Sequence, residues 1–180
     1  MRFVFKTIFK VSGWKIVGSV PSGFKKYILA VGPHTSNWDF PLGIIARSVL
    51  CIRDAKFIGK SSLFHFPYGW FFRMLGGYPV ERSKKQDMTS QVADIFNKHE
   101  NFIVAIAPEG TRKKTDRLRT GFWYIAKKAD IPVIPFGIDY RRKEIVIGET
   151  LWPGDDIHKD LEKIVAFYKT CTGKNPKYGL

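Results

Sequence analysis

His34 and Asp39 lie five positions apart, at the two ends of the segment "HTSNWD". This segment follows the apolar run "YILAVG" and a single proline, Pro33. A histidine titrates near neutral pH, so it can take a proton from a substrate as a general base. A neighbouring aspartate can hold the imidazole in one tautomer and stabilise the imidazolium that forms. The same spacing also suits a plain loop in which Asp39 only caps the following helix. Other residues must therefore decide whether the pair predicts catalysis.

Two later segments, "ERSKK" and "PEGTRKK", supply such residues, and each also begins at the end of an apolar run. They contain Arg82 and Arg112, and an arginine can bind phosphate through two parallel hydrogen bonds. The second of them also offers a carboxylate, a close backbone approach and a hydroxyl, at Glu109, Gly110 and Thr111. A base, a group that orients it and cations that hold an anion together predict an enzyme site.

Alternating apolar runs and amphipathic stretches predict the elements that position these residues. This order is typical of an α/β fold, and we expect one domain with a mixed, largely parallel sheet flanked by helices. Ligands of such sheets bind beyond the carboxyl ends of the strands, where all three segments fall. The expected strands are 26–32, 55–59, 78–81, 101–108, 131–140 and 143–149, and the expected helices are 39–50, 85–100, 120–130 and 155–170, with an aromatic helix or irregular segment at 66–75.

The N-terminal stretch, residues 1–20, predicts an amphipathic helix ahead of the α/β domain at 21–180. Arg2, Lys6 and Lys10 fall on one helical face, and apolar residues fill much of the rest. Such a helix suits a membrane interface, although it could equally pack on the core of its own domain. Residues 172–180 are predicted to form a loose basic tail.

Composition limits the class of protein and its partners. Thirty Lys and Arg against 16 Asp and Glu give a net charge of +14, which predicts an anionic partner: nucleic acid, a membrane surface or a phosphorylated substrate. Two distant cysteines predict a reducing compartment, and four scattered histidines do not form a metal site. No apolar run is long enough to span a bilayer, and lysines interrupt the start of the chain where a secretory signal would be apolar.

The "HTSNWD" segment resembles the H-x4-D motif of the 1-acylglycerol-3-phosphate O-acyltransferase family, also called the glycerolipid or lysophosphatidic acid acyltransferases. "GGYPVERS", "APEGTRKK" and "IPVIPFGI" resemble the next three blocks of that family, in the same order, and "GKSSLF" resembles its lysine-containing segment. The chain departs from the usual pattern at Pro33, Glu81, Ala107 and Lys113. None of these positions carries a catalytic group, but they leave the identity of the acceptor open.

The resemblance implies a fold, a reaction and roles for particular residues. A fatty acyl group would pass from acyl-CoA or acyl-ACP to the hydroxyl of a lysophosphatidic acid-like lipid in phospholipid biosynthesis, with His34 as base and Asp39 orienting it. No metal or other cofactor is implied. The lipid acceptor would make the protein a peripheral enzyme at the cytoplasmic face of an anionic membrane, with acyl carrier protein as a further possible partner. The residues implied to bind the acceptor and its phosphate are Lys60, Arg82, Glu109, Gly110, Thr111 and Arg112.

Several residues keep two interpretations. Lys60 suits either the phosphate site or an ordinary surface. Trp38 suits packing, including packing against the acyl arm. Phe66, Trp70 and Phe71 suit contact with the acyl chain or the membrane, although aromatic residues at helical spacing more often belong to the core.

Two other functions stay open. One is an acyltransferase with a different acceptor, such as another lysophospholipid or an amino-acid lysolipid. The other is a non-enzymatic nucleic-acid-binding domain, which the charge and the 15% aromatic content permit. The basic residues, however, form neither one helix face nor an RNA-binding motif, and such a domain would leave His34 and Asp39 without a role.

Overall fold

The computed structural model describes residues 2–52, 54–80 and 88–179. Within these residues, seven strands form one sheet in the order β1-β7-β6-β2-β5-β3-β4. Every neighbouring pair is parallel except β6 with β7, which confirms the predicted mixed, largely parallel sheet. The strands are β1 (Lys15–Val17), β2 (Lys26–Gly32), β3 (Ala55–Lys60), β4 (Gly77–Val80), β5 (Phe102–Ile106), β6 (Val133–Asp139) and β7 (Glu144–Ile147).

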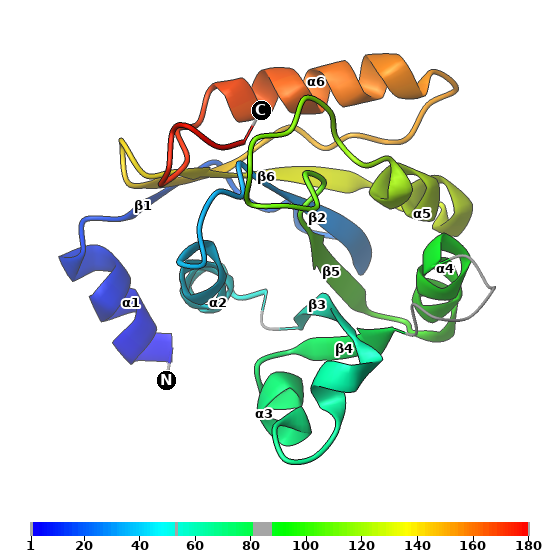
Figure 1. Ribbon diagram of the computed structural model, residues 1–180, viewed down its shortest axis with the longest axis horizontal. Coiled ribbons are helices and arrows are strands. Elements are labelled where there is room, and N and C mark those ends of the chain that lie inside the picture. Colours follow the sequence, from blue (N-terminus) through cyan, green and yellow to red (C-terminus); the bar gives the residue numbers. More distant parts are fainter. Residues whose placement is uncertain (1, 53, 81–87, 180) are drawn as a thin grey trace.

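Helices cover both faces of the sheet (Figure 1). Two of them, α1 and α2, contact each other and pack on one face, whereas α4, α5 and α6 contribute to the core on the other face. The short α3 follows a 3-10 turn, η1, beyond the edge formed by β3 and β4. The helices are α1 (Arg2–Val11), α2 (Asp39–Val49), η1 (Ser61–Phe64), α3 (Gly69–Met74), α4 (Met88–Lys98), α5 (Gly121–Ala129) and α6 (Ile157–Lys169).

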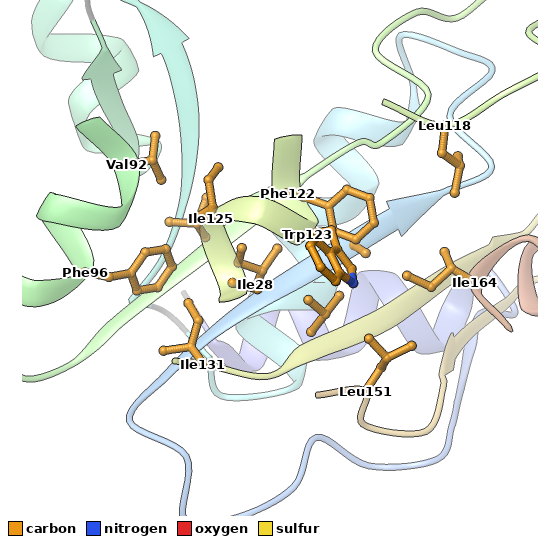
Figure 2. Packing of buried hydrophobic residues seen from close by; sticks show 14 of the residues in the cluster. Ile28, Val92, Phe96, Leu118, Phe122, Trp123, Ile125, Ile131, Leu151 and Ile164 are labelled. Atoms are coloured by element: carbon orange, nitrogen blue, oxygen red, sulfur yellow. The ribbon is translucent and has the colours of Figure 1, made fainter. Parts of the chain in front are cut away.

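Strand β2 lies in the middle of the sheet, and both of its faces are buried. Successive side chains point to opposite faces, so Ile28 enters the cluster with α5 while Leu29 enters the cluster with α2. Figure 2 shows Ile28 among Phe122 and Ile125 of α5. Full burial of one such aliphatic side chain is worth roughly 1.5–3 kcal/mol. This two-sided burial explains why the run before His34 is apolar throughout and shows no alternation.

Strand β1 is an element that the sequence analysis does not predict. Its three residues, Lys15–Val17, pair with β7 in parallel and extend the sheet beyond the antiparallel β6–β7 pair. A strand this short carries too few residues to show a periodic pattern. The N-terminal helix is present, but it ends at Val11.

The aromatic segment around α3 lies at the surface, so the interpretation as core is wrong for its three predicted residues. Phe66, Trp70 and Phe71 are 98%, 67% and 42% exposed. Phe64, by contrast, is buried against Gly59 and Gly77 and fixes the segment to the sheet edge. Helical spacing therefore predicted the helix but could not show which way its aromatic side chains face.

Within the described ranges, no helix combines the length and the apolar character needed to cross a membrane. Helix α1 is amphipathic: Phe9 is buried on the sheet side, while Phe3 and Val11 are each 82% exposed. The helix thus packs on its own domain and still presents apolar side chains outward. Packing of α1 on its own domain is therefore compatible with the other interpretation of the sequence, a helix at a membrane interface.

Candidate active site

The candidate site lies where three adjacent parallel strands end. His34 and Asp39 follow β2, Glu109 follows β5 on one side of it, and Tyr140 follows β6 on the other. Gly32, the last residue of β2, lies against the ring of Tyr168, and a Cβ there would be 2.7 Å from a ring carbon. Only glycine allows the strand to leave the sheet this close to α6.

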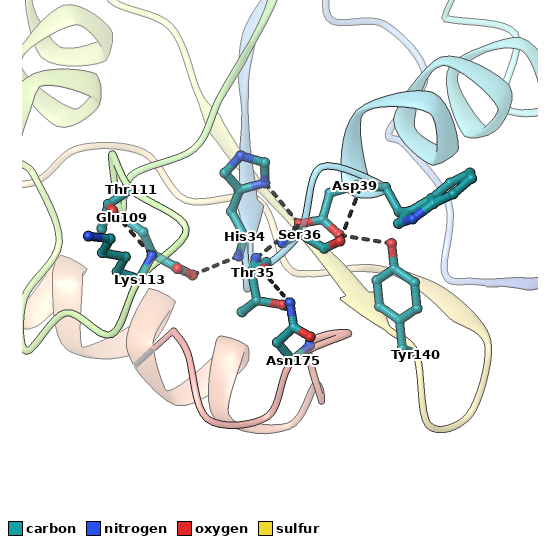
Figure 3. A network of polar contacts seen from close by, with 10 residues as sticks. His34, Thr35, Ser36, Asp39, Glu109, Thr111, Lys113, Tyr140 and Asn175 are labelled. Atoms are coloured by element: carbon teal, nitrogen blue, oxygen red, sulfur yellow. Dashed lines mark hydrogen bonds and ion pairs between the residues drawn. The ribbon is translucent and has the colours of Figure 1, made fainter.

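Asp39 collects four hydrogen-bond donors (Figure 3). Its Oδ2 lies 3.0 Å from His34 Nδ1 and accepts the backbone N–H groups of Thr35 and Ser36, each at 2.9 Å. Its Oδ1 accepts the hydroxyl of Tyr140 at 2.8 Å. Asp39 is the first residue of α2, where a carboxylate also interacts favourably with the helix dipole.

These contacts keep Asp39 ionised although it is buried. Burial by itself would raise the pKa of Asp39, but hydrogen bonds from His34, Ser36 and Tyr140 outweigh it, so the pKa lies below its ordinary value. An ionised carboxylate can only accept, so Nδ1 of His34 carries the proton. Nε2 is then left with a free lone pair. Since His34 also lines the neighbouring cavity, this lone pair is available to a ligand there.

Glu109 supports the backbone of His34. Its Oε1 accepts the His34 N–H at 3.0 Å, and the residue is only 2% exposed. Burial raises the pKa of Glu109, and the hydrogen bond from His34 offsets only part of that effect. Oε2 has no hydrogen-bond partner within the described chain. The carboxyl group of Glu109 therefore holds the backbone of the loop that carries His34 and Asp39.

The last described residues complete the loop, so the predicted loose tail is wrong. Asn175 donates from its backbone N–H to Thr35 Oγ1 at 3.2 Å and from its side-chain amide to the Thr35 carbonyl at 2.9 Å. Gly179 accepts the N–H of Thr115, in the loop after β5. Figure 1 shows the C-terminal segment returning beside that loop. Short polar stretches carry no periodic signal, so the sequence could not predict this docking.

A cavity of about 780 Å³ extends from His34 along the face of α2 that carries Phe40, Gly43 and Arg47. It exists because β3 pairs with β5 only as far as Phe57 and then continues with β4 alone. Ile58 and Ile106, on the two sides of this divergence, both line it. The remaining apolar walls come from β2, α2, α4, α5 and β6 and include Leu29, Val31, Phe40, Ile44, Val92, Phe122, Ile125 and Phe136.

Cations line the same cavity. Arg112, Arg119 and Lys56 contribute to its wall, together with Arg47, whose guanidinium donates to two backbone carbonyls. Gly110 has a φ of +63°, a backbone conformation that favours glycine, and it lies against the Arg119 side chain, where a Cβ would be 2.4 Å from Nε. The sequence does not predict a role for Arg119, because it belongs to a dense basic run, residues 111–119, in which nothing shows which side chains face the cavity.

The structure brings some of the predicted residues together and leaves others apart. His34, Asp39, Gly110 and Arg112 line the cavity, and Glu109 lies directly behind it. Thr111 accepts the N–H of Lys113. Arg82 lies outside the described residues. Lys60, Trp38, Phe66, Trp70 and Phe71 do not line the cavity: Lys60 is exposed at the end of β3, and Trp38 is 63% exposed beneath the ammonium group of Lys174.

The turns at residues 35–37 and 109–111 carry backbone N–H groups that could stabilise a developing oxyanion, and the hydrogen bonds already made narrow the choice of donor. The amides of Thr35 and Ser36 already donate to Asp39, and that of Gly110 donates to the Ala107 carbonyl. The amides of Asn37 and Thr111 are the candidates that remain from the two turns, together with that of Glu109.

Comparison with known proteins agrees with this fold. Residues 13–139 match the Acyltransferase family. A 1-acyl-sn-glycerol-3-phosphate acyltransferase of Saccharomyces cerevisiae is 32% identical over 134 residues, and one of Streptococcus pneumoniae is 27% identical over 117 residues. The crystal structure of the 1-acyl-sn-glycerophosphate (LPA) acyltransferase PlsC from Thermotoga maritima gives a TM-score of 0.65 at 22% identity, covering 94% of this chain and 75% of that one.

The chain is an α/β protein with a mostly parallel sheet and a His–Asp pair at the carboxyl edge of that sheet. The family match covers more than half of the sequence, so the chain belongs to the acyltransferase family. The alignments cover 67% and 64% of this chain but only 41% and 42% of the yeast and streptococcal proteins. The chain thus matches about two fifths of the length of these two relatives.

Proposed function

We propose that this chain transfers a fatty acyl group from an acyl thioester to the free hydroxyl of a lysophosphatidic acid-like lipid. The observation that carries the proposal is the His34–Asp39 pair at one end of an apolar cavity whose wall also holds Arg112 and Arg119. The names of the yeast and streptococcal relatives point to the same acceptor.

The mechanism needs no covalent enzyme intermediate. His34 Nε2 takes the proton of the acceptor hydroxyl while the hydroxyl oxygen attacks the thioester carbonyl carbon. A C–O bond forms, the C–S bond breaks, and the imidazolium returns its proton to the departing thiolate. Asp39 stabilises the imidazolium between these steps. This is the logic of a catalytic triad in which the substrate itself supplies the nucleophile.

Different parts of the cavity wall suit the hydrocarbon chain and the phosphate group of the substrates. Its apolar part suits a hydrocarbon chain, whose burial is worth about 0.8 kcal/mol per methylene. Arg112 and Arg119 suit the acceptor phosphate, because guanidinium groups form paired hydrogen bonds with it. Either acyl-CoA or acyl-ACP can deliver such a chain, so both belong in the assay.

We also propose that the chain works at the cytoplasmic face of a membrane. Residues 1–38 and 55–80 contain no Asp or Glu, so α1 and the η1–α3 segment combine apolar side chains with uncompensated positive charge. Exposed Phe3 on α1 and Phe66 and Trp70 near α3 suit the boundary between headgroups and acyl chains.

The test is thiol release from acyl-CoA and from acyl-ACP, each with lysophosphatidic acid and with other lysolipids. We expect acceptor-dependent release from the wild type and loss of at least 1000-fold in His34→Ala, on the order of removing a triad member. The matched control is His158→Ala, which changes an exposed histidine on α6. Full activity in His34→Ala with an unchanged melting temperature would refute the mechanism, and preference for another lysolipid would change the acceptor.

A further inference from the structure

Tyr140 extends the His34–Asp39 pair into a chain of three groups. We propose that Tyr140 is a positioning residue that holds the Asp39 carboxylate in the orientation needed to align the His34 imidazole. This inference rests on the proposed function, since it assigns a role in the same reaction.

The two carboxylate oxygens of Asp39 are bound in different ways. Oδ2 receives three donors, from His34 and from the amides of Thr35 and Ser36. Oδ1 receives the hydroxyl of Tyr140. With donors on Oδ2 alone, the carboxylate could still swing about that oxygen. The hydrogen bond to Oδ1 fixes the plane of the carboxylate, and this in turn fixes the orientation of the imidazole ring that is bound to Oδ2.

Tyr140 is itself held by segments that are distant in sequence. It follows β6, its backbone N–H donates to the Thr172 carbonyl at 2.8 Å, and its ring meets the ring of Trp14 edge-on at 5.2 Å. At the preceding residue, Asp139 accepts the N–H groups of Arg141 and Arg142 and closes the turn. The hydroxyl is thus presented to Asp39 from a rigid frame.

The phenol serves only as a donor. Burial raises the pKa of Tyr140, and the hydrogen bond to Asp39 raises it further, so the hydroxyl keeps its proton wherever His34 can act as a base. Tyr140 does not line the cavity, so it is not expected to touch either substrate. Its loss should therefore change the rate of the chemical step and leave substrate binding intact.

The test compares Tyr140→Phe, which keeps the ring, with Arg142→Gln, which loosens the same turn but keeps the hydroxyl. We expect Tyr140→Phe to lower kcat roughly 10- to 100-fold, as for loss of one hydrogen bond to a charged group, with both KM values within twofold of wild type. Arg142→Gln should lower the melting temperature and leave kcat unchanged, because it breaks the ion pairs with Asp139 and Glu144 and the hydrogen bond to the Thr170 carbonyl, and none of these contacts involves the Tyr140 hydroxyl. An unchanged kcat in Tyr140→Phe, or the same kcat loss in Arg142→Gln, would overturn the proposal.

A second readout is independent of turnover. The proton between His34 Nδ1 and Asp39 should give a far-downfield proton NMR resonance that is lost in Asp39→Asn and shifted in Tyr140→Phe. A resonance that Tyr140→Phe leaves unchanged would contradict the link. If the wild type released no thiol with any donor and acceptor, the proposed function would fail, and this resonance, which needs no turnover, would still show whether Tyr140 acts on the pair.

Discussion

Gly43 offers a direct test of where the acyl chain lies. It occupies the middle of α2 and lines the cavity, and a Cβ built on it meets no atom within 4 Å. A Cβ at this position would therefore lie in open space at the cavity wall, and a longer side chain would extend from there. Replacement by leucine adds four carbon atoms, and we expect each to exclude about one methylene of a bound chain.

The magnitude follows from the free energy of methylene burial. At about 0.8 kcal/mol each, four excluded methylenes cost about 3 kcal/mol, or a loss of about 200-fold in kcat/KM for a long-chain thioester. Gly43→Ala adds one carbon and should cost about fourfold on the same scale. Both variants remove glycine from a helix interior, so both should also be more stable by roughly 0.5–1 kcal/mol.

The assay measures kcat/KM for a palmitoyl thioester and for one shorter by four carbons, together with melting temperature. We expect Gly43→Leu to lose activity selectively on the long chain while its melting temperature rises by about 1–4 °C. Equal kcat/KM on both chains in a more stable Gly43→Leu would refute the reasoning, because the acyl chain would then not pass α2.

Three further changes test the electrostatics and the surface. Glu109→Gln removes a buried carboxyl group whose pKa is raised. The free energy of unfolding of the wild type should fall as pH rises through that pKa, whereas that of the variant lacks this dependence. The difference in melting temperature, variant minus wild type, should therefore grow from pH 4 to pH 8. Arg119→Gln should raise the KM for the acceptor roughly 3- to 10-fold with kcat little changed, since an exposed guanidinium loses only part of a charge-assisted bond. Phe66→Ser combined with Trp70→Ser should weaken co-sedimentation with anionic vesicles roughly 10-fold or more, because both side chains lie outside the core.

Each of the three predictions has a result that would contradict it, and the last two have a matched control variant. A melting-temperature difference that stays constant with pH would show that Glu109 does not titrate as its burial requires. Arg117→Gln changes a neighbouring exposed arginine that does not line the cavity, and an equal KM effect there would point to general charge. Tyr124→Ser removes an exposed aromatic on α5, and equal loss of vesicle binding would argue against a specific membrane face.

Long apolar runs made most of the sheet predictable. The run 26–32 coincides with β2, and 101–108 contains β5, because strands buried on both faces must be apolar at every position. The same logic placed His34 and Glu109 at one edge, since parallel strands end together. Amphipathic periodicity likewise identified α2 and α6 to within a few residues.

Contacts between segments that are distant in the sequence could not be predicted from apolar runs and periodicity. Tyr140 lies 101 positions after Asp39, and only the pairing of β6 with β2 brings them together. Arg119 enters the cavity because the loop after β5 folds back across Gly110. Composition and spacing describe each segment separately, so they cannot show which member of a basic run faces inward.

The pairing of Asn175 with Thr35 spans 140 positions, and it has a consequence in time. At a synthesis rate of about 5–20 residues per second, the loop that carries His34 exists for roughly 7 to 28 seconds before its partner has been made. During that interval Thr35 lacks both donors, so the loop that carries His34 is without two of its hydrogen bonds. The proposed site is therefore expected to be complete only after residue 175 has been made, later than the exposed aromatic side chains of α1 and of the segment around α3.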